Sequence, residues 1–342
     1  MKNINSLLVT GSAGFIGYHL TKALLSQGYD VVGIDNLNEY YDPQLKMDRL
    51  DELDRYVKSN SIQNRYHFFK QDISDLDALN KLFEQFQFDL VFNLAAQAGV
   101  RYSLENPSTY IQSNLVGFAN ILECSRHNKI KHLIFASSSS VYGMNVKQPF
   151  SASDSTDHPV SLYAATKKSN ELMAFSYSHL FKIPCTGLRF FTVYGPFGRP
   201  DMAYYKFACA IRDNRTIDVF NAGKMKRDFT YVDDIVSGML KIMDKPPVIQ
   251  SFDVTSAEAP YKIFNIGNNN PVKLADFIKT IELTVGRKAV IRHLPMQPGD
   301  VPETYADIDD LYEEIRFRPS TTLREGMKKF VDWLNKYNKR IN

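Results

Sequence analysis

The sequence predicts an α/β fold with a doubly wound parallel sheet, followed by a smaller α/β domain. Over roughly the first 190 residues, short β-branched runs alternate with amphipathic helical patterns. A glycine-rich segment, residues 11–17, joins the first apolar run to the first helical pattern. After about residue 190 the alternation ends, and Pro, Gly and aromatic residues cluster in Val193–Tyr205. We therefore expect a first domain of residues 1–190, joined by 228–255, and a second domain of 191–342 that partly interleaves with it.

Six apolar runs predict the strands, and buried parallel strands should be apolar throughout, as Leu7-Leu8-Val9 is. The expected strands are Ser6–Thr10, Asp30–Asp35, Tyr66–Lys70, Leu90–Ala95, His132–Ser137 and Thr186–Phe191. Helical patterns lie at Ile16–Gln27, Leu76–Gln85, Tyr110–His127 and Leu162–Phe181, and later at Asp228–Met243 and Thr321–Tyr337. The charged helical insert Glu39–Asn64 is typical of a solvated face.

Composition excludes several classes of protein. The chain has 342 residues with 41 basic and 38 acidic side chains, a net charge of +3, and no dense basic run, so we expect no nucleic-acid partner. The three cysteines form no CxxC pair and are expected to be buried free thiols. The seven histidines form no metal-binding array, so no metal is expected. The apolar start, Met1–Val9, is too short for a leader or a membrane span, and we expect no membrane partner and a cytoplasmic location.

The glycine segment has the spacing GxxGxxG and opens a helix directly after a strand. Glycines there permit a tight turn and close backbone approach to a pyrophosphate, and the helix N-terminus favours the negative charge. We expect the segment to bind a dinucleotide through Gly11, Ala13, Gly14, Phe15, Ile16 and Gly17.

Asp35 ends the second strand, 18 residues past Gly17, where a carboxylate can accept hydrogen bonds from a ribose diol. Its charge would repel a 2′-phosphate, which favours NAD over NADP. Further cofactor contacts are expected at strand ends, from Asn36, Asn38, Asp72, Ile73, Leu94, Ala95, Ala96 and Gln97. Asp72 has the alternative interpretation of a simple cap.

Tyr163 and Lys167 are four residues apart, so both project from one face of a helix. A nearby ammonium group would favour the phenolate, which could then act as a base. A YxxxK pair is common on protein surfaces. Its context makes it specific here, because the run Ser137–Ser140 ends the fifth strand at the carboxyl edge of the sheet, where such folds bind ligands.

Together these segments resemble the extended short-chain dehydrogenases/reductases, which have a Rossmann-like NAD-binding domain. The segment Arg-Asp-Phe-Thr-Tyr-Val-Asp-Asp, residues 227–234, fits the same pattern. Within the family the whole chain is similar to UDP-sugar 4-epimerases, and the stretches Ala95–Pro107 and Phe191–Ala203 are similar to those of UDP-glucuronate 4-epimerases. The resemblance implies that residues 1–190 bind NAD, that 191–342 bind a UDP-sugar, and that UDP-glucuronate becomes UDP-galacturonate through a transient 4-keto sugar.

The resemblance also implies roles for single residues. Tyr163 takes the proton of the 4-hydroxyl, Lys167 bonds the nicotinamide ribose, and Ser138 or Ser139 hydrogen-bonds O4. NAD stays bound because it is regenerated in each turnover. Further cofactor contacts fall on Phe190 and on either Ser113 or Asn114. Substrate contacts fall on Ser138, Thr192, Arg199, Val219, Arg227, Gln297 and Asp300.

Arg199 is the expected partner of the uronate carboxylate, and Arg227 that of the diphosphate, where guanidinium geometry suits the anion. With Lys167 they would make a locally positive site in a chain of balanced charge. A 4-epimerase of neutral or N-acetylated UDP-hexoses stays open as an alternative.

Uronate decarboxylases and 4,6-dehydratases carry carboxylates in the serine segment, whereas this chain has Ser139-Ser140-Val141. A non-catalytic redox-sensing module is disfavoured because Tyr163 and Lys167 are both present. Relatives pair the helices Tyr110–His127 and Leu162–Phe181 across a two-fold axis, so a homodimer is expected.

Overall fold

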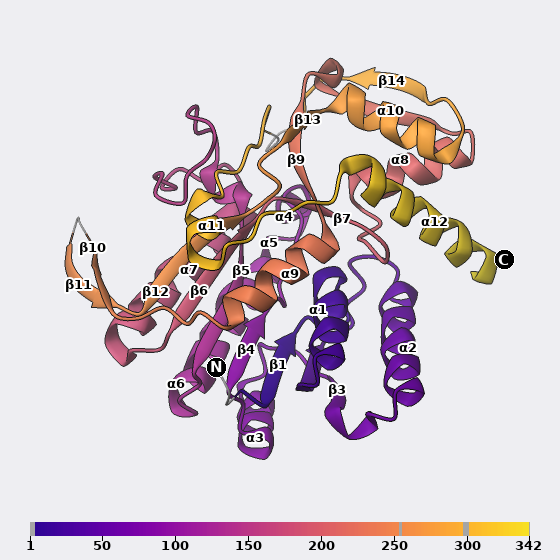
Figure 1. Ribbon diagram of the computed structural model, residues 1–342. Coiled ribbons are helices and arrows are strands. Elements are labelled where there is room, and N and C mark those ends of the chain that lie inside the picture. The colour runs from indigo at the N-terminus through magenta and orange to yellow at the C-terminus, as the bar shows by residue number, and fades with distance from the viewer. Residues whose placement is uncertain (1–3, 253–254, 297–300, 342) are drawn as a thin grey trace. The chain divides into compact units, whose positions relative to one another are not determined.

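The computed structural model describes residues 4–252, 255–296 and 301–341 (Figure 1). These form two compact units that alternate along the chain. Unit 1 comprises residues 1–144, 154–189 and 239–264, and unit 2 comprises 145–153, 190–238 and 265–342.

A seven-stranded sheet organises unit 1, in the order β12-β6-β5-β4-β1-β2-β3. β1 pairs in parallel with β2 and β4, β2 with β3, and β4 with β5, which confirms the expected doubly wound topology. The strands are β1 Ser6–Thr10, β2 Asp30–Asp35, β3 Tyr66–Lys70, β4 Leu90–Asn93, β5 His132–Ser138, β6 Cys185–Phe190 and β12 Tyr261–Ile266.

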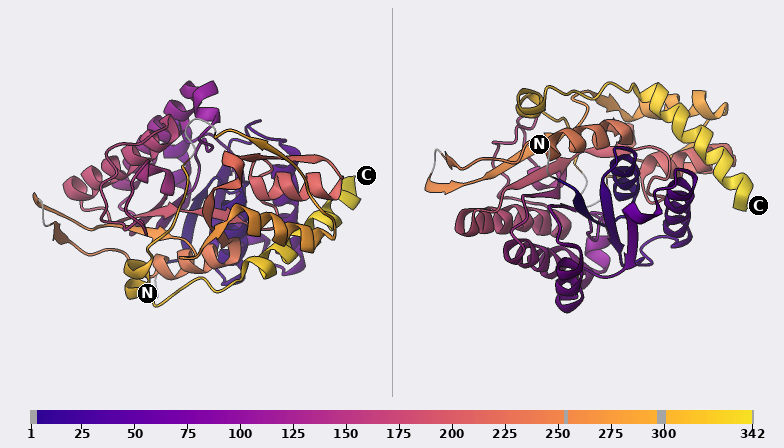
Figure 2. Two further views of the ribbon diagram at one scale, coloured as in Figure 1. Left: turned by 90° about the horizontal axis from the view of Figure 1, so that it is seen from above. Right: turned by 60° about the horizontal axis from the view of Figure 1, so that its bottom comes forward.

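Helices cover both faces of this sheet, with α1 on one side of the strands and α3 on the other (Figure 2). α3, α6 and α7 pack in one layer, and their apolar side chains join those of Leu8, Val91 and Leu133 in a single core. Helical segments of unit 1 are α1 Phe15–Ser26, α2 Gln44–Ser59, η1 Gln63–Arg65, α3 Leu76–Phe86, α4 Tyr102–Glu105, α5 Pro107–Tyr110, η2 Ile111–Val116, α6 Gly117–His127, η3 Ser139–Tyr142 and α7 Leu162–Phe181. β10 Gln250–Phe252 and β11 Thr255–Ala259 form an antiparallel pair.

Unit 2 contains a three-stranded sheet, β13-β9-β7, and a parallel pair, β14-β8. Its core includes Phe229 of β9 stacked on Phe277 of α10, with ring centroids 4.1 Å apart. Elements in this part of the chain are β7 Thr192–Tyr194, α8 Ala203–Arg212, β8 Thr216–Phe220, η4 Asn221–Gly223, β9 Lys226–Tyr231, α9 Val232–Met243, β13 Pro271–Lys273, α10 Leu274–Val285, β14 Val290–Leu294, α11 Asp309–Ile315 and α12 Leu323–Ile341.

The helix expected over Asp228–Met243 is wrong at its start. Residues up to Tyr231 belong to strand β9, and α9 begins only at Val232. The run Phe-Thr-Tyr has high strand propensity, and Phe229 to Tyr231 are buried. Asp233 and Asp234 then suit the first turn of α9, because negative charge is favourable at a helix N-terminus.

The interpretation of Glu39–Asn64 as a solvated face is also wrong for one side of the helix. α2 buries Leu50, Leu53 and Val57 on that side, and with them the charged side chains of Lys46 and Arg49. These residues recur with helical spacing, so the two cations share the buried face of an otherwise polar helix.

Candidate active site

The glycine loop lies between β1 and α1 at the carboxyl end of the sheet. Gly11 has a φ of +67°, and a Cβ on it would lie 2.9 Å from the backbone nitrogen of Ala95. A Cβ on Gly17 would collide with the Gly11 carbonyl. Among the described residues no side chain caps α1 at Gly14, and no acidic residue lies in its first turn. The loop therefore presents close-packed backbone and an uncapped helix N-terminus, which together suit a pyrophosphate.

Asp35 is buried at the end of β2, and helix α2 supplies its partner. The Lys46 ammonium lies 3.3 Å from Asp35 Oδ1 and donates to Asn38 Oδ1 at 2.9 Å. Arg49, fully buried, donates to the Ala13 carbonyl in the glycine loop at 2.8 Å. Sequence reasoning missed both cations. Their place in the apolar stripe of α2 was the available signal.

Polar side chains connect the remaining strand ends. Asn36 donates to Asp72 Oδ2 at 2.7 Å, and Asn38 donates to Gln97 Oε1 at 3.4 Å. Burial alone would raise the pKa of Asp72, but hydrogen bonds from Asn36 and Ser74 hold it below its usual value. Asp72 accepts from the Ser74 backbone, as the alternative interpretation of a simple cap predicts. Ile73 beside it is buried, and Leu94, Ala95 and Ala96 are half-buried after β4.

Asn114 and Ser113 both lie in the π-helical turn η2, but their surroundings differ. Asn114 is buried, accepts from the Gln97 backbone at 2.8 Å and donates to Thr166 Oγ1 at 3.0 Å, whereas Ser113 is half-buried. The backbone carbonyl of Asn114 also accepts a hydrogen bond from the Asn170 side chain at 2.6 Å. Asn114 therefore joins the loop after β4 to helix α7, and such π-turns are frequent at functional sites.

Tyr163 and Lys167 lie on successive turns of α7, whose first turn is capped by Ser161. Lys167 is 4% exposed and donates to the Ala136 carbonyl of β5 at 2.9 Å. Burial lowers the pKa of Lys167 to about 8. The Tyr163 ring is half-buried and makes an edge contact with Tyr110, with centroids 6.1 Å apart. The helix and the end of β5 are thus joined at the YxxxK pair.

The serines at the end of β5 have different surroundings. Ser137 is buried and donates to Glu171 Oε1 at 2.6 Å. Ser138 caps the short helix η3 by accepting from the Ser140 backbone at 3.2 Å, and it also donates to Ser140 Oγ. Ser139 follows, half-buried, in η3. Ser137 is therefore committed to the interior, while Ser138 and Ser139 occupy the turn beside it.

In unit 2, Arg199 is held by a neighbouring carboxylate. Its Nε and Nη2 donate to the two oxygens of Asp201 at 3.1 and 2.6 Å. Thr192 is half-buried in β7, and Phe190 is half-buried at the end of β6. The fork of Arg199 is thus shaped for a carboxylate and already binds one.

Arg227 lies half-buried on β9 and donates to the carbonyls of Lys226 and Pro302. Next to it, buried Asp228 accepts from the backbones of Asn268, Asn269 and Ala306, at 2.8, 3.0 and 3.1 Å. Burial raises the pKa of Asp228 to about 6 against these hydrogen bonds.

Val219 is 2% exposed, so its side chain belongs to the core of unit 2. Gln297 and Asp300 lie outside the described residues.

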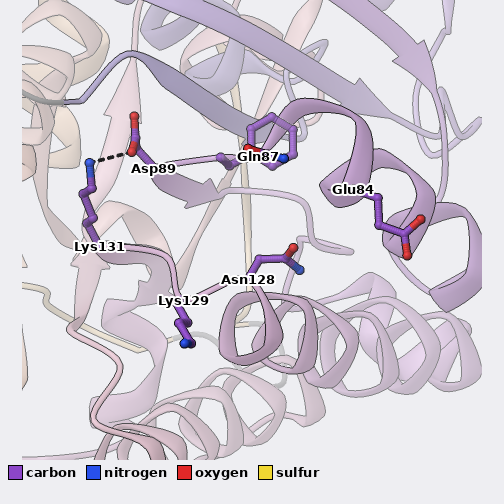
Figure 3. Close-up of a pocket in the computed structure, with 7 residues that line it drawn as sticks. Glu84, Gln87, Asp89, Asn128, Lys129 and Lys131 are labelled. Carbon is purple, nitrogen blue, oxygen red and sulfur yellow. Dashed lines mark ion pairs between the residues drawn. The ribbon is translucent and has the colours of Figure 1, made fainter.

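A cavity of about 480 Å³ lies at the opposite edge of the unit 1 sheet, where Asp89 and Lys131 directly precede β4 and β5. These two side chains lie side by side and pair at 2.7 Å (Figure 3). Its lining is polar and remote from the YxxxK end of the strands. It is formed by Glu84, Gln87, Phe88, Asp89, Asn128, Lys129 and Lys131.

The described residues contain no group of three or more His, Cys, Asp or Glu side chains placed to hold a metal ion. Nor do they include a helix with the length and hydropathy needed to cross a bilayer.

Comparison with known proteins places this geometry in a family. Residues 7–267 match the model of the NAD dependent epimerase/dehydratase family. "Protein CapI" of Staphylococcus aureus is 55% identical over 98% of this chain and 99% of its own, and a "Probable UDP-glucuronate 4-epimerase" of Rhizobium meliloti is 46% identical over 98% of both. The crystal structure of UDP-glucuronic acid 4-epimerase from Bacillus cereus, in complex with UDP-glucuronic acid and NAD, has a TM-score of 0.84 and 32% identity, covering 97% of this chain and 99% of that one.

Proposed function

This chain belongs to the NAD-dependent epimerase/dehydratase family, and we propose that it interconverts UDP-glucuronate and UDP-galacturonate by inverting C4 of the sugar. The observation that carries the proposal is the agreement of the YxxxK site on α7 with a near full-length match to an epimerase that binds this same sugar nucleotide and NAD. The serine turn after Ser138 contains no carboxylate, which favours epimerisation over elimination or decarboxylation.

The described residues fit NAD as the cofactor. The tight, side-chain-free turn at Gly11 and the uncapped N-terminus of α1 suit the pyrophosphate, and the buried Asp35 suits the adenosine ribose. Lys46, bonded to Asp35, orients that carboxylate. When bound, NAD supplies a reversible hydride acceptor for the hydrogen on C4 of the sugar.

Protein side chains around C4 of the sugar transfer the proton of the 4-hydroxyl group. Tyr163, as the phenolate, accepts the proton of the 4-hydroxyl, and the cationic Lys167 one turn further along α7 favours that phenolate. Ser138, held in the turn by its contacts with Ser140, hydrogen-bonds O4 and keeps it in line with Tyr163. After the 4-keto sugar has rotated within the site, so that it presents its other face, Tyr163 returns the proton to O4.

Unit 2 carries the residues that we propose for the rest of the UDP-sugar: Arg227 for the diphosphate, Thr192 and Arg199 for the uronate, the β8 backbone at Val219 for the uracil, and Gln297 and Asp300 for UDP. A 4-keto uronate is a β-keto acid, which loses CO2 when the bond to its carboxylate aligns with the ketone π system. Arg199 holds the carboxylate away from that alignment. It does so with the guanidinium edge that now binds Asp201.

Replacing Arg199 by alanine is expected to lower kcat/KM for UDP-glucuronate by about 10- to 100-fold, because a charged hydrogen bond to the substrate is lost. A second expected sign is a decarboxylated product. Arg212→Ala is the matched control, since Arg212 pairs in the same way with its own neighbour, Asp213. Equal kinetics and products for Arg199→Ala and the control would show that the clamp lies elsewhere.

The proposed reaction is tested by incubating the purified protein with UDP-glucuronate and no added NAD, then resolving products by NMR. We expect UDP-galacturonate. UDP-glucose and UDP-N-acetylglucosamine are tested in parallel, and turnover of these alone would identify a neutral-sugar epimerase instead. Release of CO2 or of a 6-deoxy-4-keto sugar as the main product would identify a decarboxylase or a dehydratase.

We also propose a cytoplasmic homodimer. Large apolar side chains are exposed on η2 and α7, two segments that pack against each other, and this is unusual for a monomer surface. They include Ile111, Val116, Leu172 and Leu180, at 42%, 39%, 58% and 63% exposure. A light-scattering mass of one chain at micromolar concentration would exclude the dimer. The three cysteines are free, as is typical of a reducing compartment.

A further inference from the structure

A buried ion pair lies next to the catalytic residues. Glu171 of α7 and Arg189 of β6 are 4% and 3% exposed. Arg189 Nε and Nη2 donate to the two Glu171 oxygens, both at 2.8 Å, which is the bidentate geometry of a strong charge-assisted pair. Neither residue has a role in the proposed proton transfer.

The pair is bonded to the residues on both sides of Ser138. Before it, Ser137 donates to Glu171 Oε1 at 2.6 Å. After it, Tyr142 accepts from Arg189 Nη1 at 2.9 Å, and the guanidinium lies 4.8 Å from the centre of its ring. Both ends of the serine turn, Ser137–Tyr142, are therefore attached to one ion pair.

The same pair is attached to the helix that carries the base. Glu171 is one turn beyond Lys167, which is one turn beyond Tyr163, so the three side chains share a face of α7. Lys167 donates to the carbonyl of Ala136, the residue before Ser137. Tyr261 of β12 donates to the Glu171 carbonyl at 2.9 Å and braces the helix at this level.

We propose that Glu171 and Arg189 are positioning residues, which hold the Ser138 turn and the Tyr163–Lys167 helix in one fixed register. Well-packed hydrophobic residues of similar volume often stabilise a protein interior as well as a buried ion pair does, so a buried pair is weak evidence of a purely stabilising role. What apolar side chains cannot do is form directional bonds to Ser137 and Tyr142 at once. The inference rests on the proposed epimerase function, in which Ser138 and Tyr163 must both reach O4.

The test distinguishes a role in positioning the reacting groups from a contribution to the stability of the fold. In Glu171→Leu/Arg189→Met, apolar side chains replace the pair, and we expect a cooperatively folded protein whose unfolding midpoint falls only by the loss of the bonds to Ser137 and Tyr142. We also expect unchanged KM for UDP-glucuronate and a kcat lower by about 100-fold, the effect of a misplaced reacting group. A folded double variant whose kcat is within about threefold of wild type would overturn the proposal.

A second variant decides the matter if the double variant does not fold. Ser137→Ala keeps the ion pair and removes only its bond to the serine turn. We expect about tenfold lower kcat with unchanged KM, and an unchanged kcat would overturn the proposal. Ser178→Ala is the matched control, because Ser178 is a buried α7 serine that donates at 2.9 Å to the Pro260 carbonyl away from the site; it should keep its kcat.

Wild-type turnover is measured first. No turnover of any UDP-sugar overturns the proposed function and this inference with it, whereas an active wild type with unaffected variants overturns the positioning role alone.

Discussion

Tyr163→Phe is expected to lower kcat for UDP-glucuronate by about 10³-fold, while leaving NAD binding and the unfolding midpoint unchanged. Removing a positioned general base costs on the order of 10²- to 10⁴-fold. The ring is retained, so its edge contact with Tyr110 persists. The first two turns of α7, residues 162–168, contain no other phenol.

The measurement is steady-state kinetics with NMR detection of UDP-galacturonate. Tyr177→Phe, on the same helix, is the control, since its hydroxyl bonds Glu123 away from the YxxxK end. A Tyr163→Phe enzyme within tenfold of wild-type kcat would assign the base to another residue.

Lys167→Met is expected to abolish most activity and yet to stabilise the fold at neutral pH. The activity falls by about 10²- to 10³-fold, because the phenolate loses the cation that favours it. The stability rises because a buried ammonium group is removed. Lys167 is charged at pH 7 in both the folded and the unfolded chain, and only the folded chain buries that charge.

The sign of the pH dependence follows from the lowered pKa. Below about pH 8 the folded chain bears the full cost of the buried charge, about 3 kcal/mol for a pKa lowered from 10.5 to about 8. Between those pH values the unfolded chain binds more protons, so wild-type stability from this residue rises with pH. The methionine variant also leaves the Ala136 carbonyl unpaired, which costs about 1–3 kcal/mol and reduces its net advantage.

Denaturant unfolding of nucleotide-free protein at pH 7 and pH 10 measures the difference. We expect the stability of the methionine variant relative to wild type to fall between the two pH values. Lys168→Met is the control: Lys168 is partly exposed and bonds Thr156, so its replacement should change neither kcat nor this pH dependence. A difference independent of pH would show that Lys167 is not a costly buried cation.

Features that depend on short sequence spacing were predicted correctly. Six of the seven strands of the central sheet and the helices α1, α3 and α7 lie within one or two residues of expectation, whereas β12 was not predicted. The four-residue spacing of Tyr163 and Lys167 fixes their common helical face whatever surrounds the helix. The need for glycine at position 11 is likewise local, because its positive φ and its close approach to Ala95 follow from a tight strand-to-helix turn.

Two errors of the sequence analysis share a physical cause. A run of charged residues does not reveal which of them will find an ion-pair partner and be buried. Lys46 is buried because it pairs with Asp35. Similarly, Phe229 to Tyr231 were assigned to a helix from their surroundings in sequence, whereas Phe277, 48 residues away, stacks on the strand they form.

The sequence by itself determined six strands of the central sheet, the glycine turn between β1 and α1, and the common helical face of Tyr163 and Lys167, because these depend on local periodicity and on turns of a few residues. Only the tertiary structure decided which polar groups serve the site from inside. Ser137 and Glu171 are 34 residues apart, and Glu171 and Arg189 are 18 apart. Such pairs form because burial leaves a charged group no water to bond, so it must find its partner in whichever strand or helix packs beside it.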